Sequence, residues 1–145
     1  MSMPVEVEKF LNTENFCFLA TSYQDDPHVC LMNFTYLAAE ELIILSSRKD
    51  TTKVNHITKN SAVSLLFYSL GESGEMQMSC TLNGSATLVS PASDTHYRNY
   101  HYKKHPHMGA FIIGENISVI TVRIHHAALA DVEDKVRTWT QDSFR

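Results

Sequence analysis

Residues 41–60 read E-L-I-I-L-S-S-R-K-D-T-T-K-V-N-H-I-T-K-N, and this stretch decides the fold prediction. Its apolar run L-I-I-L predicts a buried strand, and a segment of helical character follows the strand. Asp50 is suited to cap the helix, Val54 and Ile57 lie three residues apart on one face, and Asn60 is suited to end it. The stretch therefore predicts a strand that leads directly into a helix.

The junction between this strand and this helix carries hydroxyl and cationic side chains. Ser46, Ser47, Arg48 and Lys49 come directly after the apolar run, and Lys53 lies in the predicted first turn of the helix. Unpaired N–H groups at a helix N-terminus attract anions, and an arginine can donate two hydrogen bonds to phosphate oxygens. The junction is therefore a candidate site for a phosphate monoester. The alternative interpretation is a solvated basic turn.

Composition places the chain among ordinary globular proteins. Its 145 residues suit a single domain over 1–145, with 43% hydrophobic and 19% charged residues. The net charge of -4, with both signs interspersed, gives no electrostatic footprint for nucleic acid or for an anionic membrane. A phosphate site must then depend on a local pocket.

Cysteine usage and the first residues bear on the compartment. Cys17, Cys30 and Cys80 lie far apart in apolar runs, which is typical of free thiols in a reducing compartment and not of a zinc site. The first residues show no signal-peptide pattern, and no window reaches membrane-spanning length. We expect a cytoplasmic protein without a metal site.

The remaining pattern predicts a mainly β, α+β chain: a six-stranded antiparallel barrel with peripheral helices. Expected strands cover residues 16–21, 28–37, 42–45, 62–68, 76–89 and 117–124, with 127–132 as a possible extension, and expected helices cover 4–11, 50–60 and about 90–102. Asn83-Gly84 is open to two interpretations, a two-residue hairpin or a glycine bulge within one long strand. The charged tail from Glu133 onward, with Trp139, receives no element.

The order of these segments resembles the FMN-binding split barrels related to pyridoxamine 5'-phosphate oxidase. The resemblance covers residues 10–123, and it favours the bulge at Asn83-Gly84. It is carried by F-C-F-L-A-T-S from Phe16, P-H-V-C-L-M-N-F from Pro27, L-S-S-R-K-D-T-T-K-V from Leu45, K-N-S-A-V-S-L-L-F-Y from Lys59, N-G-S-A-T-L-V-S from Asn83 and M-G-A-F from Met108.

The resemblance implies a cofactor site and an assembly. Ser47, Arg48 and Lys49 match a phosphate-binding motif, and residues 28–33 match the strand that lines the flavin ring. It also implies a homodimer with two FMN molecules at the subunit interface, in which Ser79 reaches the partner's cofactor. The implied cofactor-binding residues are His28, Val29, Leu31, Met32, Asn33, Leu45, Ser46, Ser47, Arg48, Lys49, Lys53, Ser79 and His107.

Two departures from the true oxidases argue against vitamin B6 oxidation. Asn33 stands where those enzymes often have a lysine, and residues 132–145 lack their Arg-Leu-His ending. Residues 97–104 still carry cations and tyrosines, which leaves a second phosphate site there as a speculation.

The resulting hypothesis is a small FMN-dependent oxidoreductase that passes electrons from a reduced nicotinamide, or from another bound substrate, to an acceptor. The flavin supplies the chemistry, so no catalytic side chain is assigned. The substrate, and the choice between FMN and a deazaflavin, are left open.

Two other classes of function compete with this hypothesis. His96, His101, His105 and His107 lie close together in the sequence, which allows a haem-binding split barrel, although a hydrophilic histidine-rich loop explains them more simply. A non-catalytic module that binds or senses FMN or another phosphorylated ligand is the second alternative.

Overall fold

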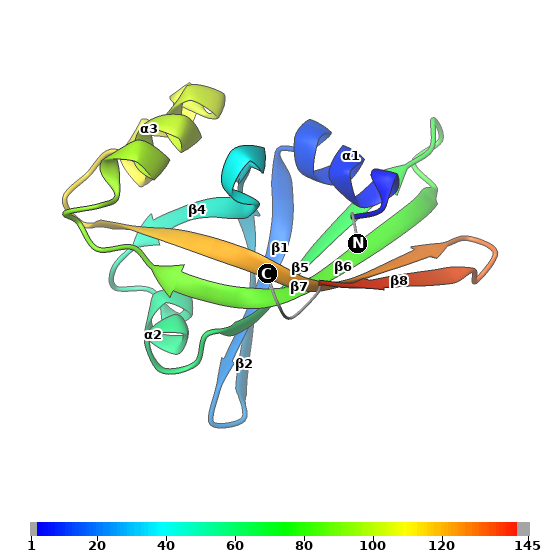
Figure 1. Ribbon diagram of the computed structural model, residues 1–145, viewed down its shortest axis with the longest axis horizontal. Coiled ribbons are helices and arrows are strands. Elements are labelled where there is room, and N and C mark those ends of the chain that lie inside the picture. The colour runs from blue at the N-terminus through cyan, green and yellow to red at the C-terminus, as the bar shows by residue number, and fades with distance from the viewer. Residues whose placement is uncertain (1–2, 142–145) are drawn as a thin grey trace.

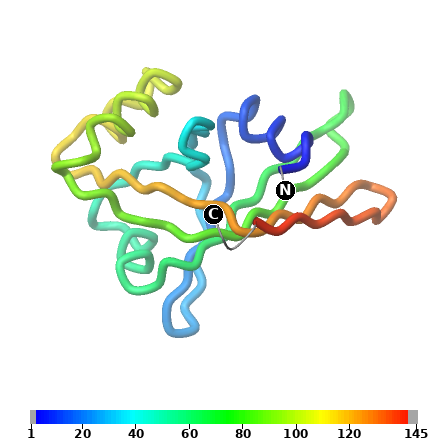
Figure 2. The backbone as a smooth tube through the Cα atoms, viewed as in Figure 1, coloured from blue at the N-terminus to red at the C-terminus, as the bar shows by residue number. Residues whose placement is uncertain are grey.

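A computed structural model describes residues 3–141. Its strands form one antiparallel, eight-stranded sheet in the order β2-β1-β5-β6-β7-β4-β3, with β8 paired to β7, and the sheet curls into a half-barrel (Figures 1 and 2). The strands are β1 Phe16–Tyr23, β2 Asp26–Asn33, β3 Thr35–Leu37, β4 Leu42–Arg48, β5 Ala62–Leu70, β6 Met76–Leu88, β7 Ile117–Asp131 and β8 Val136–Thr140. The helices are α1 Val5–Thr13, η1 Ala38–Glu40, α2 Thr52–Lys59, α3 Thr95–Lys104 and η2 Pro106–Phe111.

The predicted strand-to-helix junction is confirmed. The strand β4 pairs with β7 over its whole length, α2 buries Val54 and Ile57, and Asn60 is the C-terminal cap. The predicted N-cap was wrong, because Thr51 has the extended backbone of a cap at φ −96° and ψ 158°. Asp50 lies in the preceding turn, with its carboxylate 3.6 Å from the Arg48 guanidinium.

The long strands β6 and β7 run side by side across the molecule (Figure 1). The strand β6 continues through Asn83-Gly84, where its register against β7 shifts, so the bulge is confirmed and the hairpin alternative is wrong. A Cβ atom at Gly84 would lie 2.3 Å from the backbone oxygen of Arg123. This close approach of two backbones explains why the bulge carries a glycine.

The expected strand count of six was too low. The alternating segment 28–37 is divided between β2 and β3 at Phe34, whose side chain is fully buried. The tail forms β8, which was missed because its residues alternate poorly and are mostly charged or polar. Its one buried side chain, Trp139, joins the main core and supplies the packing that propensity does not predict.

The helix expected from about residue 90 begins later than predicted. Pro91 lies in a turn, and α3 starts at Thr95 after Asp94. The Asp94 side chain is buried and pairs with Arg98 four residues on, and Arg98 also bonds carbonyl oxygens of the distant loop, so tertiary contacts accompany the helix start. No helix within residues 3–141 is long and apolar enough to cross a bilayer.

The main core lies inside the curled sheet, where α1 and α2 cover it. Val7, Phe10 and Leu11 of α1 and the two apolar residues of α2 join the buried side chains of the strands. The three cysteines are free thiols; Cys17 and Cys80 are buried, and burial raises the pKa of each to about 12. These thiols are therefore packing groups at neutral pH.

Replacing Gly84 with alanine tests the bulge. We expect Gly84→Ala to lower the free energy of unfolding by about 1–3 kcal/mol, because the new methyl group must displace backbone. Gly109→Ala is the matched control, since its Cβ would meet nothing closer than a Tyr102 ring carbon at 3.4 Å. Urea denaturation gives both values, and equal losses in the two variants would contradict this account.

Candidate functional site

A cavity of about 330 Å³ opens where β2 and β4 end and α2 begins, and α3 and η2 close it from the other side. The junction predicted from the sequence thus forms one wall of a real cavity. Its lining residues are Leu31, Met32, Asn33, Ser46, Ser47, Arg48, Thr51, Lys53, His101, Met108, Phe111 and Ile112.

One end of this cavity is cationic and hydroxyl-rich. Arg48 and Lys53 supply the charge, and Ser47 and Thr51 lie with their hydroxyl oxygens 3.1 Å apart. Both hydroxyls also donate to the Arg48 carbonyl oxygen, at 3.2 and 3.1 Å, which fixes the turn that carries the arginine. The arginine side chain is 60% exposed, and within residues 3–141 its one ion-pair partner is the exposed Asp50, so it is available to an anion.

The other end is uncharged. Leu31, Met108 and Phe111 give it apolar surface. Asn33 adds a buried amide oxygen, Oδ1, that has no hydrogen-bond partner among the described residues. A buried polar atom without a partner costs free energy, so a ligand N–H that reached Asn33 Oδ1 would relieve that cost.

His101 lies in the cavity wall and was not among the predicted cofactor contacts. Its ring is 1% exposed, and Nδ1 lies 2.7 Å from the buried Thr35 hydroxyl. Burial, aided by the nearby His105 and Lys104, lowers the pKa of His101 to about 3. In the unfolded chain the pKa of His101 is about 6.5, so the unfolded state takes up the proton first as pH falls. The contribution of His101 to the free energy of unfolding is therefore fully present above pH 6.5 and is lost as pH falls from 6.5 towards 3.

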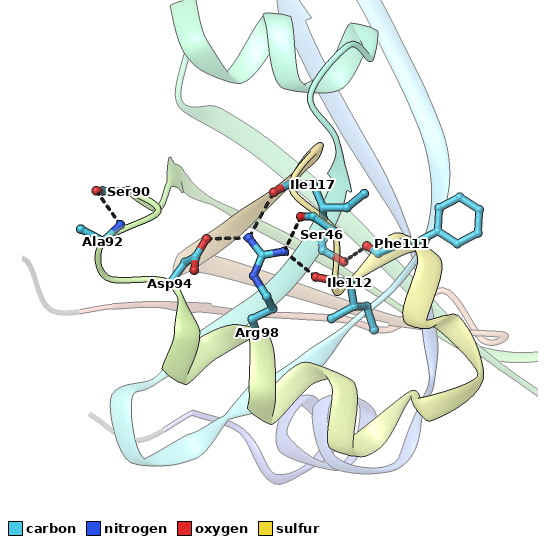
Figure 3. A network of polar contacts seen from close by, with 9 residues as sticks. Ser46, Ser90, Ala92, Asp94, Arg98, Phe111, Ile112 and Ile117 are labelled. Atoms are coloured by element: carbon cyan, nitrogen blue, oxygen red, sulfur yellow. Dashed lines mark hydrogen bonds and ion pairs between the residues drawn. The ribbon is translucent and has the colours of Figure 1, made fainter.

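A partly buried arginine holds the loop that closes the cavity (Figure 3). The Arg98 guanidinium donates to the Asp94 carboxylate at 2.6 Å and to the carbonyl oxygens of Ile112, Gly114 and Ile117 at 2.5, 3.2 and 3.2 Å. Ser46 adds a second tie by donating to the Phe111 carbonyl oxygen at 2.7 Å. Arg98 is therefore a structural residue, which removes it from the speculated second phosphate site.

Several predicted contacts lie outside the cavity lining. Leu45 is fully buried in the core, so only its backbone is left for a ligand. Lys49 and His107 are exposed, and His107 immediately precedes the lining residue Met108. His28 lies on β2, with its ring centroid 6.3 Å from that of His56. These assignments stay predictions.

Two further predicted contacts, Val29 and Ser79, lie on the outer face of the sheet. Register places Val29 beside Ala20, and Ser79 beside Tyr68. The face they share is exposed and apolar across β2, β1, β5 and β6; we call it the outer apolar face, and it comprises Phe16, Phe18, Val29, Leu31, Leu66 and Tyr68.

The remaining histidines of the predicted cluster have separate roles. His96 bonds Glu40 Oε2 at 2.8 Å on the surface, and His105 donates from Nε2 to the Phe34 carbonyl oxygen at 2.7 Å. Among residues 3–141, no group of three or more His, Cys, Asp or Glu side chains is placed to hold a metal ion.

The sequence pattern identifies only some of the residues that line the cavity. Thr51 and the pair Met108 and Phe111 lie inside quoted motifs but were not chosen as contacts. His101 was considered only in the histidine cluster of the haem alternative, and Ile112 carried no signal, because their place in the wall depends on how α3 and η2 fold back over the strand ends.

Comparison with known proteins agrees with this geometry. The model of the pyridoxamine 5'-phosphate oxidase family matches residues 3–127. A pyridoxamine 5'-phosphate oxidase homolog of Schizosaccharomyces pombe is 26% identical over 170 aligned positions, which cover 94% of this chain and 90% of the relative.

Two solved structures share the fold. A heme binding protein from Mycobacterium smegmatis superposes with a TM-score of 0.81 at 14% identity, covering 97% of this chain and 60% of that one. A FAD-binding protein from Mesorhizobium loti gives 0.73 at 14% identity, covering 86% and 90%.

These findings define the class as an antiparallel half-barrel of the split-barrel type. Since the family match spans most of the sequence, the chain belongs to the pyridoxamine 5'-phosphate oxidase family.

Removing the buried guanidinium tests the loop tie. We expect Arg98→Met to lower the free energy of unfolding by about 3–5 kcal/mol, because it leaves the Asp94 carboxylate buried without its partner. Arg137→Met is the matched control: its ion pair with Glu6 is exposed, and we expect a loss below about 1 kcal/mol. Urea denaturation compares them, and a small loss in Arg98→Met would show that the network is dispensable.

Proposed function

We propose that this protein binds FMN in the cavity and acts as a flavin-dependent oxidoreductase. The single observation that carries the proposal is the division of the cavity into a cationic, hydroxyl-rich end and an uncharged end with apolar surface. A phosphate ester joined to a flat aromatic ring has the same two halves. Arg48 and Lys53 would hold the phosphate, and Leu31, Met32, Asn33 and Met108 would line the ring.

The residues present fit this cofactor. The unpartnered Asn33 Oδ1 would accept a hydrogen bond from a ring N–H, and the uncharged wall suits a ring that carries no charge. Bound FMN would supply two-electron chemistry, with hydride coming from a reduced nicotinamide or another substrate and the electrons and proton leaving to an acceptor and to solvent. The protein positions the ring and screens it from water. Vitamin B6 oxidation is not proposed.

We also propose that two copies pair through the outer apolar face. Leu31 belongs both to this face and to the cavity lining and is 60% exposed, so the cavity opens beside the face. A partner packed there would cover the exposed apolar side chains and complete the cavity wall. Ser79 lies on the same face, which supports its role as a contact to the partner's cofactor. We keep a cytoplasmic location as a prediction.

Haem binding is the rival class of function. Because the His101 imidazole lies in the cavity wall, this cavity is favoured as the haem site over a site elsewhere. The absorbance spectrum of the purified protein distinguishes the two. We expect flavin absorbance bands at about 370 and 450 nm, close to the positions of the bands of free flavin. A haem Soret band that His101→Ala abolishes would overturn the proposal. Flavin that binds but is never reduced by a nicotinamide would indicate a non-catalytic binding module.

Removing the Arg48 guanidinium tests the phosphate end. We expect Arg48→Ala to weaken FMN binding by about 1.5–3 kcal/mol, the contribution of charge-assisted hydrogen bonds, with little change in apoprotein stability. Fluorescence titration measures the affinity, and Arg137→Ala, an exposed arginine elsewhere, is the control. A large loss of apoprotein stability would mean that Arg48 is structural.

A charge on the outer apolar face tests pairing. We expect Leu66→Asp to yield monomers and to weaken FMN binding at least about tenfold, because a carboxylate is costly to bury. Val136→Asp is the control, since Val136 is 58% exposed on β8 and lies outside this face. Light scattering after size exclusion gives the mass, and a monomeric wild-type protein would end the dimer proposal.

A further inference from the structure

His101 is held in a way that leaves one ring nitrogen for a ligand. The Thr35 hydroxyl is 4% exposed, and His101 Nδ1, at 2.7 Å, is its hydrogen-bond partner. A buried hydroxyl keeps its proton bonded by donating it to Nδ1, and a neutral imidazole then carries its own proton on Nε2. Since the ring lines the cavity, Nε2–H is a donor available to whatever occupies it.

The neighbouring histidine fixes the ring without competing for this nitrogen. The rings of His101 and His105 form an edge contact with centroids 5.1 Å apart. His105 uses its own Nε2–H on the Phe34 carbonyl oxygen. The donor on His101 is thus part of a rigid wall, and the low pKa of His101 keeps the ring uncharged at neutral pH.

Two uncharged polar side chains therefore line the same cavity: His101, with its Nε2–H donor, and Asn33, whose Oδ1 is an unpartnered acceptor among the described residues. Such a pair suits a neutral heterocycle that carries carbonyl and N–H groups on its ring. It does not suit a second phosphate or a carboxylate, which would leave Asn33 Oδ1 unsatisfied, and the lining residues from β2, α3 and η2 include no cation.

We propose that His101 is a ligand-binding residue that donates from Nε2 to a carbonyl oxygen of the bound flavin ring, with Asn33 accepting from a ring N–H. This inference rests on the proposed function. It assigns recognition of the uncharged ring to α3 and β2, apart from recognition of the phosphate by Arg48 and Lys53.

Two side-chain substitutions separate this role from a structural one. Glutamine can place its amide nitrogen, a donor, near the position of Nε2, whereas asparagine can place its amide oxygen near Nδ1, where it accepts from the Thr35 hydroxyl. His101→Gln therefore keeps the ligand contact and loses the Thr35 contact, and His101→Asn does the reverse. We expect His101→Gln to bind FMN within about twofold of wild type, and both His101→Asn and His101→Ala to bind about fivefold more weakly, the scale of one neutral hydrogen bond.

Riboflavin, which lacks the phosphate, is the second probe. His101→Ala and Asn33→Leu should weaken riboflavin and FMN by the same factor, whereas Arg48→Ala should weaken FMN alone. Fluorescence titrations give these affinities, with the thermal midpoint of each variant as the folding control. A variant series in which asparagine preserves affinity and glutamine loses it would overturn the proposal, as would equal affinity in all three variants.

A measurement on the wild-type protein covers the case in which a variant fails to fold. In the nitrogen-15 spectrum of the histidine rings, the Nε2–H resonance of His101 should shift and exchange more slowly with water when FMN or riboflavin is added. An unmoved resonance in protein saturated with flavin would refute the contact. If the wild-type protein binds neither flavin, the proposed function fails; if it binds both and His101 has no effect, only this inference fails.

Discussion

The structure depends on burying both faces of β4. Ile43 and Leu45 point into the main core, while Ile44 packs on the other side with Val119 and the partly buried Tyr97 of α3. A strand sandwiched in this way cannot slip by one residue without turning core side chains to the opposite layer. Its pairing with β7 therefore fixes where the strand ends, and the hydroxyl and cationic residues of the junction follow at that end.

The same burial explains which predictions succeeded. The run of residues 42–45 was identified from its apolar character alone, because a doubly buried strand must be apolar throughout. The helix α2 was found because its apolar residues recur at helical spacing. Local pattern did not predict β8, since its place in the sheet is set by the single buried Trp139 and by pairing with the β7 segment from His126 to Ala130.

The candidate site was predictable only where it is local in sequence. Ser46, Ser47, Arg48 and Lys53 lie within eight positions of one another, so the chemistry of the junction was visible in one stretch. The wall that α3 and η2 contribute was not visible. Its position depends on Arg98 bonding backbone carbonyls in a loop up to 19 residues away, and no spacing rule encodes such a contact.

Different elements of the fold supply the charged part and the uncharged part of the cavity. Cations come from the β4–α2 junction, which faces solvent and can retain hydrated charges at little cost. The polar groups at the other end are an amide oxygen on β2, which carries no charge, and the His101 imidazole on α3, whose neutral form burial favours. Lys104 lies close enough to His101 to lower its pKa, but its ammonium donates to the Glu14 carbonyl oxygen and lies over the Phe34 ring. The uncharged end is therefore a consequence of packing as well as of recognition.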